Sequence, residues 1–223
     1  KWSYLNLNYN IVFNAGSSVY SYDTVTNRKN YIIDTFNWTI IDGGNRPLIT
    51  QPLTIQYKTL RGDKTISLPL SGNVDVDIDW GDSKYVSVYT SGVISHTYDV
   101  PGIFTVKIYN SLEHFGNGVE SYPNANKVFK VIDFGNINLT SLSGAFNSAV
   151  NLIQVPTSIP ATITDISYLF FQATSFNDPN IISWNVQNIR DISYIFFNAT
   201  SFNQPIGSWN TSQVKNMLNM FAN

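Results

Sequence analysis

The feature that most constrains this chain is a tandem repeat in its last third. Residues 165–177 and residues 191–203 are identical at all but two positions, and a further copy begins at Asn216 and stops at Asn223. A more diverged copy precedes them, and its matching residues are Leu142, Ala145, Phe146, Ala149 and Leu152. Repeats of about 25 residues indicate a solenoid, because one such unit cannot bury its apolar side chains alone. The diverged copy is expected to be the terminal cap of that solenoid.

Within each repeat, apolar residues are spaced as on one face of an α-helix. At positions i, i+3, i+4 and i+7 stand Ile166, Leu169, Phe170 and Ala173, and in the next copy Ile192, Ile195, Phe196 and Ala199. This spacing predicts a helix of about two turns. A turn at Pro179 or Pro205 follows, and the segment at Trp184 or Trp209 is expected to be extended. One short helix and one short strand per repeat predict an α/β solenoid similar to leucine-rich repeats.

Residues 65–109 show a different pattern, which is typical of short β-strands. Residues 74–80 alternate strictly between apolar side chains and aspartates, so one face of this strand is expected to be buried and the other exposed. Further strands are expected at residues 65–70, 85–89, 96–98 and 103–109, with a turn at residues 71–73. Several short strands at this spacing predict a small β-sandwich, so the whole chain is expected to be mainly β.

These patterns divide the chain into four parts. They are a β-rich N-terminal segment at residues 1–53, the β-sandwich at residues 54–110, a junction and solenoid cap at residues 111–137, and the repeats at residues 138–223. Because the chain begins at Lys1 rather than Met, we expect a leader or upstream domain before it. The break within the last repeat leads us to expect further units, or a disordered remainder, after Asn223.

Composition narrows the range of partners. The formal net charge is −2 and only 13% of residues are charged, so the chain has no basic field to attract nucleic acid. It contains no cysteine, which excludes disulfides and zinc sites made of cysteines. No apolar run reaches the ~18 residues of a membrane-spanning helix, so no membrane span is expected in this segment. The sequence also indicates no cofactor.

Two sets of motifs resemble known families. Asp-Trp-Gly-Asp at residues 79–82, followed by His-Thr-Tyr at residues 96–98, resembles a PKD-type domain, which is an Ig-like β-sandwich. Ser83 stands where that family usually has glycine. Residues 192–212, with Met-x-x-Met-Phe at residues 217–221, resemble the ~26-residue repeats of BspA-like bacterial surface proteins. In that family a PKD-like module often precedes the repeats, and the resemblance implies surface display and adhesion, sometimes in proteins of large DNA viruses.

The sequence offers no catalytic constellation. Its only histidines, His96 and His114, are not accompanied by a Gly-x-Ser-x-Gly motif that would supply an activated serine. The aspartates of the repeats, Asp165, Asp178 and Asp191, favour N-caps at helix starts over the paired carboxylates of a glycosidase. We therefore expect a protein that is not an enzyme and has no catalytic residues.

Calcium is the one metal for which the sequence offers candidate ligands. Asp75, Asp77, Asp79 and Asp82 lie close together in the sequence, and calcium prefers clustered carboxylate oxygens. Alternate positions of a strand place neighbouring carboxylates ~6–7 Å apart on one face, which is too far to close a coordination shell without loop ligands. We therefore expect no metal site, and Asp79 and Asp82 are the remaining calcium candidates.

Aromatic residues and asparagines recur once per repeat. Core packing is expected for Phe176, Phe202, Trp184 and Trp209. Tyr168 and Tyr194 lie just beside the apolar stripe, so we expect them on an exposed ligand face, where aromatic rings can stack on sugars. Buried ladders that bond the loop backbone are expected for Asn177, Asn203, Asn185 and Asn210.

Four asparagines match the acceptor pattern for N-linked glycans. They are Asn37, Asn138, Asn198 and Asn210. Such matches also arise by chance in a chain rich in asparagine, so they bear on function only if the protein follows a eukaryotic secretory route.

Together these features predict a surface-exposed, non-enzymatic protein whose solenoid binds a protein or glycan ligand. Its expected location is extracellular, on a cell surface or on a virion surface. Two alternatives remain open. The chain is either a structural component of a virion shell or fibre, with neighbouring structural proteins as partners, or an accessory region of a larger secreted enzyme.

Overall fold

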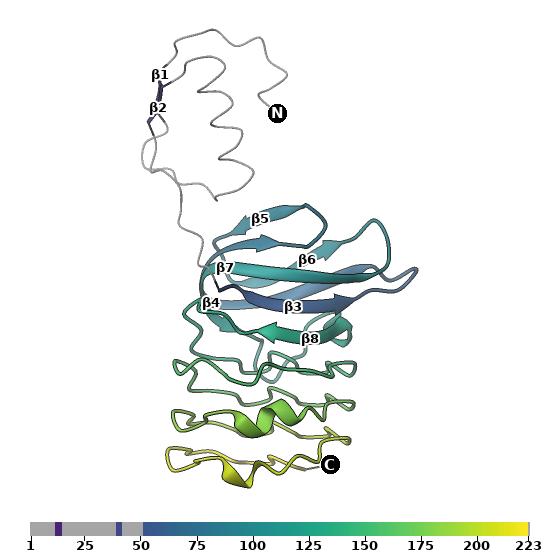
Figure 1. Ribbon diagram of the computed structural model, residues 1–223, viewed down its shortest axis with the longest axis vertical. Helices are drawn as coiled ribbons and strands as arrows, with labels where there is room; N and C mark the ends of the chain where they lie inside the picture. The colour runs from purple at the N-terminus through teal and green to yellow at the C-terminus, as the bar shows by residue number, and fades with distance from the viewer. Residues whose placement is uncertain (1–11, 15–38, 42–50, 223) are drawn as a thin grey trace. The chain divides into compact units, whose positions relative to one another are not determined.

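A computed structural model describes residues 12–14, 39–41 and 51–222 of the chain (Figure 1). The chain divides into two compact units, Lys1–Leu48 and Ile49–Asn223. In the first unit, β1 (Val12–Asn14) pairs in parallel with β2 (Thr39–Ile41). Apart from residues 51–53, which belong to the second unit, the rest of the β-rich N-terminal segment predicted at residues 1–53 lies outside the described residues.

The second unit begins with a six-stranded antiparallel sheet (Figure 1). Its strands are β3 (Leu53–Lys58), β4 (Thr65–Asp79), β5 (Tyr85–Val88), β6 (Gly92–Thr97), β7 (Ile103–Phe115) and β8 (Val128–Asp133). The order across the sheet is β5-β4-β7-β3-β8, and β6 pairs with the first half of β4. The strands predicted between residues 65 and 109 are confirmed as parts of β4, β5, β6 and β7.

The predicted PKD/Ig-like β-sandwich, however, is wrong, because these strands form one open antiparallel sheet. The difference arises at residues 71–73, where a turn between two strands was expected. β4 continues through this segment with a bulge, seen as a register shift against β7 between Ser71 and Val74. Gly72 adopts a left-handed conformation there, with φ of 69°. A bulge bends a strand without ending it. One long strand therefore pairs with β6 through its first half and with β5 and β7 through its second.

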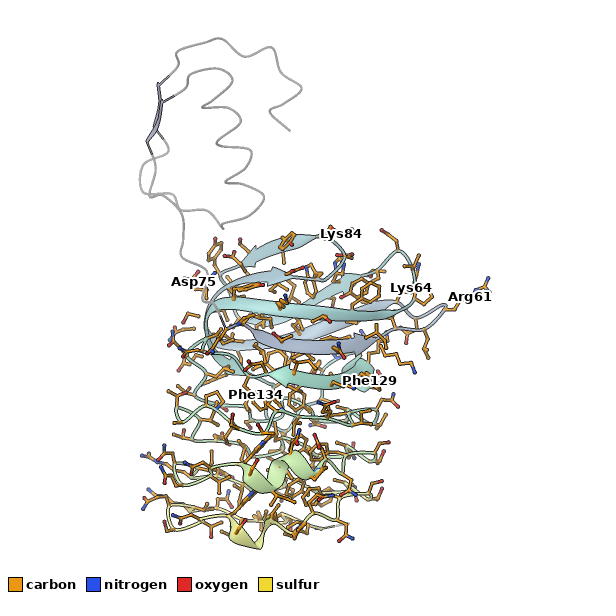
Figure 2. All side chains as sticks on the ribbon, in the orientation of Figure 1. Arg61, Lys64, Asp75, Lys84, Phe129 and Phe134 are labelled. Atoms are coloured by element: carbon orange, nitrogen blue, oxygen red, sulfur yellow. The ribbon has the colours of Figure 1, made fainter. Side chains whose placement is uncertain are left out.

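β7 and β8 join the sheet to the repeats, which stack directly against it (Figure 1). β8 is the last strand of the sheet, and its Lys130 also forms a parallel bridge with Gln154 of the first coil. His114 of β7 forms a second parallel bridge, with Ser141. Phe134 lies at this boundary (Figure 2). We call residues 138–222 the coil stack and number its coils along the chain, so that the first to fourth coils are those containing Ser141, Asp165, Asp191 and Asn216.

The coil stack contains no α-helix among its described residues, so the predicted α/β solenoid, similar to leucine-rich repeats, is wrong. Phe170 illustrates what replaces the helix. Its carbonyl accepts a hydrogen bond from the amide of Ala173, three residues later, but its own amide donates to Ile195 of the next coil. Positive φ angles at Tyr168 and Gln172, of 54° and 56°, interrupt any right-handed helix every four residues.

Alternate amides build a ladder between neighbouring coils. The amides of Ile166, Tyr168, Phe170 and Gln172 donate to the carbonyls of Asp191, Ser193, Ile195 and Phe197, respectively. Parallel bridges also connect one position of each coil to the next, through Ser141, Asp165, Asp191 and Asn216. In these successive tight turns, the side chains at i, i+3, i+4 and i+7 point into the core, as they would in an α-helix.

Short 3-10 helices also occur in the described part of the chain. They are η2 (Ala125–Lys127), η3 (Pro179–Ser183) and η4 (Ile206–Ser208). Trp184 and Trp209 follow η3 and η4 in an extended conformation, as predicted. The indole nitrogen of Trp184 donates to the carbonyl of Pro156 at 2.8 Å, which ties one coil to the previous one.

A single hydrophobic core runs from the sheet through the coil stack. A column of phenylalanine rings runs through the coils and ends at Phe221, which is 56% exposed and lies 5.6 Å from Phe196 between ring centroids. The other three rings, of Phe146, Phe170 and Phe196, are buried in the core, with successive centroids 6.0 and 5.8 Å apart. Full burial of each such ring stabilises the fold by about 1.5–3 kcal/mol relative to an exposed one. The residues of the diverged copy, such as Leu142 and Phe146, are fully buried in this core.

Candidate functional site

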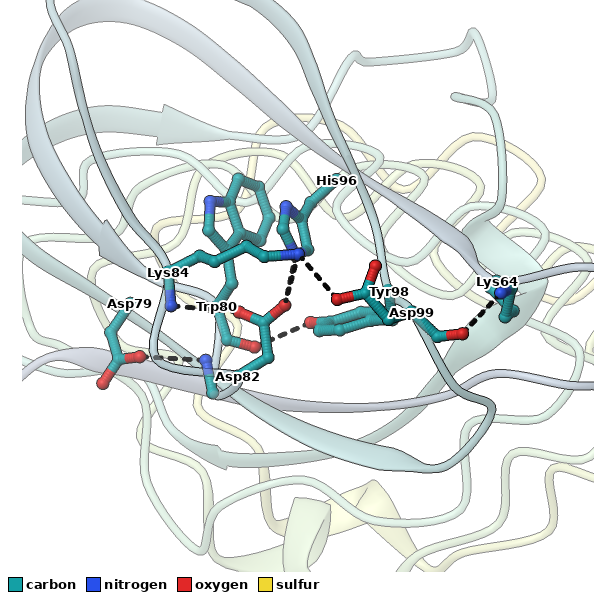
Figure 3. A network of polar contacts seen from close by, with 9 residues as sticks. Lys64, Asp79, Trp80, Asp82, Lys84, His96, Tyr98 and Asp99 are labelled. Atoms are coloured by element: carbon teal, nitrogen blue, oxygen red, sulfur yellow. Dashed lines mark hydrogen bonds and ion pairs between the residues drawn. The ribbon is translucent and has the colours of Figure 1, made fainter.

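The turn after β4 holds a network of polar contacts (Figure 3). Oδ2 of Asp82 lies 2.8 Å from Nε2 of His96 and 3.5 Å from Nζ of Lys84. Nζ of Lys84 also donates to Asp99 at 3.2 Å. Partial burial acts to raise the pKa of the Asp82 carboxyl, but hydrogen bonds and charge from His96 and Lys84 outweigh it, so this pKa lies below its ordinary value.

Aromatic rings enclose the histidine of this network. The His96 ring stacks on Trp80 at a centroid distance of 4.7 Å and meets Tyr98 edge-on, also at 4.7 Å. The Tyr98 hydroxyl donates to the carbonyl of Trp80 at 2.8 Å. Burial, with the nearby charges of Asp82 and Asp79, raises the pKa of Tyr98. The cluster holds the turn against the sheet, and we assign it a structural role.

The two calcium candidates are engaged by local backbone. Oδ1 of Asp79 accepts the amide of Gly81 at 2.9 Å, and Oδ1 of Asp82 accepts the amide of Lys84 at 3.2 Å. In the part of the chain that the structure describes, no group of three or more His, Cys, Asp or Glu side chains is placed to hold a metal ion.

Four aromatic rings form a patch on the outside of two consecutive coils, which we call the outer aromatic patch. Its members are Tyr168, Phe171, Tyr194 and Phe197, and all are partly exposed. Tyr168 stacks on Tyr194 with centroids 4.7 Å apart, and Phe171 stacks on Phe197 with centroids 4.9 Å apart; each pair is tilted by only 7°. Within each coil, the tyrosine and phenylalanine centroids lie 5.7 Å apart. Partial burial is the main reason why the pKa of Tyr168 is raised, and the nearby Tyr194 and Asp191 raise it further.

The patch is confined to these two coils. Gly144 and Asn147 occupy the matching positions in the coil before it, and Asn219 and Ala222 occupy them in the coil after it. Nδ2 of Asn219 donates to the Tyr194 hydroxyl at 3.0 Å and so borders the patch with a polar group. The result is a defined aromatic surface with polar or small residues on both sides.

Sequence reasoning found half of this patch. Tyr168 and Tyr194 were predicted on a ligand face, and the structure brings them together in one stack. Phe171 and Phe197 were missed. Their signal was the adjacent Phe-Phe pair in both repeats, because two neighbouring residues of a turn cannot both point into the core. Of the aromatic residues predicted to pack in the core, Phe176, Trp184 and Trp209 are confirmed as buried, and Phe202 is partly buried and packs against the core.

The recurring asparagines differ from expectation. Asn177, Asn203, Asn185 and Asn210 are exposed rather than buried. They do bond the loop backbone: Oδ1 of Asn177 accepts the amide of Asn203 at 2.8 Å, and Oδ1 of Asn185 accepts that of Gln187 at 3.2 Å. An oxygen that caps a turn from the outside needs no burial.

The aspartates of the repeats cap turns rather than α-helices. Oδ1 of Asp165 accepts the amide and the hydroxyl of Ser167, at 2.9 and 2.7 Å, and Asp191 does the same for Ser193. Asp178 caps the 3-10 helix η3 and also accepts the buried amide of Val155 at 2.7 Å.

The predicted glycan acceptors lie in unlike settings. Asn138 and Asn210 are exposed, whereas Asn198 is half-buried and its amide donates to the carbonyl of Ala222. Asn37 lies outside the described residues.

Comparison with known proteins gives one family match. Residues 140–223 match the family described as "Mycoplasma protein of unknown function, DUF285". This match is consistent with the resemblance to BspA-like repeats over the coil stack. It does not extend to the sheet, so it gives no support to the resemblance of residues 79–98 to PKD-type domains, whose implied sandwich the sheet does not form. No curated protein and no solved structure matches the chain. In the described part of the chain, no helix has the length and apolar character needed to cross a membrane.

Proposed function

We propose that this chain is a non-enzymatic interaction module of a surface-exposed protein, and that the outer aromatic patch is its contact surface for another protein. The observation that carries the proposal is the patch itself: four partly exposed rings from two coils, bounded on both sides by small or polar residues. Aromatic side chains are enriched at protein interfaces because they bury a large area with few rotatable bonds.

The stacking geometry favours a protein over a glycan as the ligand of this patch. Sugars bind aromatic residues by lying on a ring face. In the patch, the faces between Tyr168 and Tyr194, and between Phe171 and Phe197, are already covered by the partner ring. Stacking leaves at most one face of each ring for a ligand, together with the ring edges and the two tyrosine hydroxyls. This mixture suits the apolar and hydrogen-bonding surface of a protein.

Binding of the whole chain to a panel of immobilised, purified extracellular proteins tests this proposal. Replacing both Tyr168 and Tyr194 by serine is expected to weaken binding to the proteins captured at least tenfold, or about 1.4 kcal/mol. The matched control is Tyr89→Ser, because Tyr89 lies directly after β5, away from the patch, and is 62% exposed. Equal binding by the double variant and the wild type would contradict the proposal.

Surface exposure is the second part of the proposal. It is supported by the resemblance of the repeats to BspA-like surface proteins and by the family match over the same residues. Brief protease treatment of intact cells that make the natural protein is expected to release peptides of the coil stack. Release only after the cells are lysed would contradict surface display.

A further inference from the structure

A polar hollow of about 390 Å³ lies where the sheet meets the first coils. Its walls come from the bulge in the middle of β4, the end of β7, the loop at residues 116–118 and the first two coils. Five hydroxyl side chains line it: Ser71, Thr140, Ser141, Ser143 and Thr164. His114, Asn117 and Asp165 complete its polar side chains, and no phenylalanine, tyrosine or tryptophan is among the described residues that line it.

The walls of this hollow are fixed by backbone contacts. The amide of Gly118 donates to the carbonyl of Ser143 at 3.0 Å, and the amide of Gly116 donates to that of Pro69 at 2.9 Å. The backbones approach so closely that a Cβ placed on Gly144 would lie 2.0 Å from the carbonyl oxygen of Gly118. A site built on such contacts exists before any ligand arrives, which lowers the ordering cost of binding.

Asp165 gives this hollow a polar group that the equivalent turn of the next coil does not leave open. The same position in the next coil is Asp191, and both carboxylates use Oδ1 to cap a turn. Oδ2 of Asp191 accepts a hydrogen bond from Asn216 at 2.9 Å. Oδ2 of Asp165 has no hydrogen-bond partner among residues 51–222, and Asp165 is a half-buried residue of the wall, whereas Asn117, which also lines the hollow, is exposed. Polar groups left open in a concave site are groups that a ligand can satisfy.

We propose that this hollow binds a neutral saccharide, one sugar ring at a time. Ser71, Thr140 and Thr164 each donate the hydroxyl proton to a backbone carbonyl, so their oxygens offer lone pairs to the hydroxyl groups of a sugar. The carboxylate of Asp165 can likewise accept from a sugar hydroxyl. The volume lies at the small end of the ~300–1,000 Å³ range of ligand pockets. The negative charge of Asp165 disfavours anionic sugars. This inference goes beyond the proposed function, because it concerns different residues and a different class of ligand from the outer aromatic patch.

Saturation-transfer NMR on the whole chain tests the proposal directly. The probes are glucose, galactose, mannose and N-acetylglucosamine, with glucosamine as the cationic and N-acetylneuraminic acid as the anionic comparison. At least one neutral sugar is expected to give a saturable signal with a dissociation constant on the order of 1 mM. Asp165→Asn, which keeps the size and the turn-capping oxygen, is expected to weaken binding about tenfold, the loss that follows when a charged hydrogen-bond acceptor is removed.

Asp191→Asn is the matched control, because it removes the same charge from the equivalent turn outside the hollow. It is expected to leave sugar binding unchanged. The proposal is overturned if no neutral sugar gives a saturable signal, if both variants lose binding equally, or if only glucosamine binds, which would identify a site for an ammonium group. The double serine variant of Tyr168 and Tyr194 is expected to keep sugar binding, so failure of the proposed protein-binding patch and failure of this site remain distinguishable.

Discussion

The position of Tyr168 has a left-handed backbone conformation in every coil, and the residue type at this position determines which side chain the coil exposes. Tyr168 and Tyr194 have φ angles of 54° and 56°, while Gly144 and Asn219 hold the same position in the flanking coils. A residue with a side chain pays roughly 1–2 kcal/mol for this conformation. The ladder holds it in place, since the amide of Tyr168 donates to Ser193 at 2.9 Å. Exposure of the two tyrosines follows from this strained turn, and so does the outer aromatic patch.

Also at the residue scale, Asp82→Asn tests the polar network at the turn after β4. The folded pKa of Asp82 is lowered, so the carboxylate contributes stability above its unfolded pKa of about 3.9, and this stability is lost as the pH falls through the folded value. The variant is expected to lower the free energy of unfolding by about 1–2 kcal/mol at pH 7. Urea unfolding at pH 7 and near pH 2.5 measures this, and the difference from wild type should shrink at the lower pH. A difference that stays constant between the two pH values would show that ionisation of Asp82 contributes nothing.

At the scale of elements, periodicity identified which side chains are buried but not which backbone buries them. Ile166, Leu169 and Phe170 are fully buried, as the i, i+3, i+4 spacing requires. An α-helix and tight turns repeated every four residues share that spacing. The two differ in where the backbone amides donate their hydrogen bonds, within the segment or to the next coil. The sequence at residues 71–73 is ambiguous in the same way, because glycine and asparagine favour both turns and bulges and so do not show whether the strand ends there. Tyr168 and Tyr194 could be placed from the pattern, but the hollow could not, because it joins residues far apart in the chain.

Gln172 gives a direct test of turns against helix. Gln172→Gly removes the cost of the left-handed conformation, so we expect the free energy of unfolding to stay unchanged or to rise by up to about 1 kcal/mol. In an α-helix the same change would lower it by about 1 kcal/mol. Thr174→Gly, two residues later and without a positive φ, serves as the control and is expected to lower it by about 0.5–1 kcal/mol. Urea denaturation of the two variants side by side measures the contrast, and equal losses in both would favour the helix.

At the scale of the second unit, sheet and coils depend on one core. Buried residues from β3 to Trp209 form a single cluster rather than one cluster per module. The backbone is shared as well, since the amide of Leu112 in β7 donates to the carbonyl of Ile137 at 2.8 Å. Repeat proteins gain stability from each neighbour interface, so a terminal unit needs a partner that covers its apolar face. In this chain the sheet serves as that cap, which explains why the diverged first copy can be fully buried.

Phe134 tests whether sheet and coils unfold together. Its ring is fully buried at their boundary, with centroids 6.5 Å from Phe146 and 5.8 Å from Trp184. Phe134→Ala is expected to lower the free energy of unfolding by about 3–5 kcal/mol, and Phe134→Leu by less. Hydrogen exchange read by mass spectrometry should then show faster exchange in peptides of β4 and in peptides of the second and third coils alike. Leu60→Ala, in an exposed hairpin, is the control and should change stability by less than about 0.5 kcal/mol. Faster exchange confined to the coils would mean that the sheet is stable without them, and that the shared core does not couple the two.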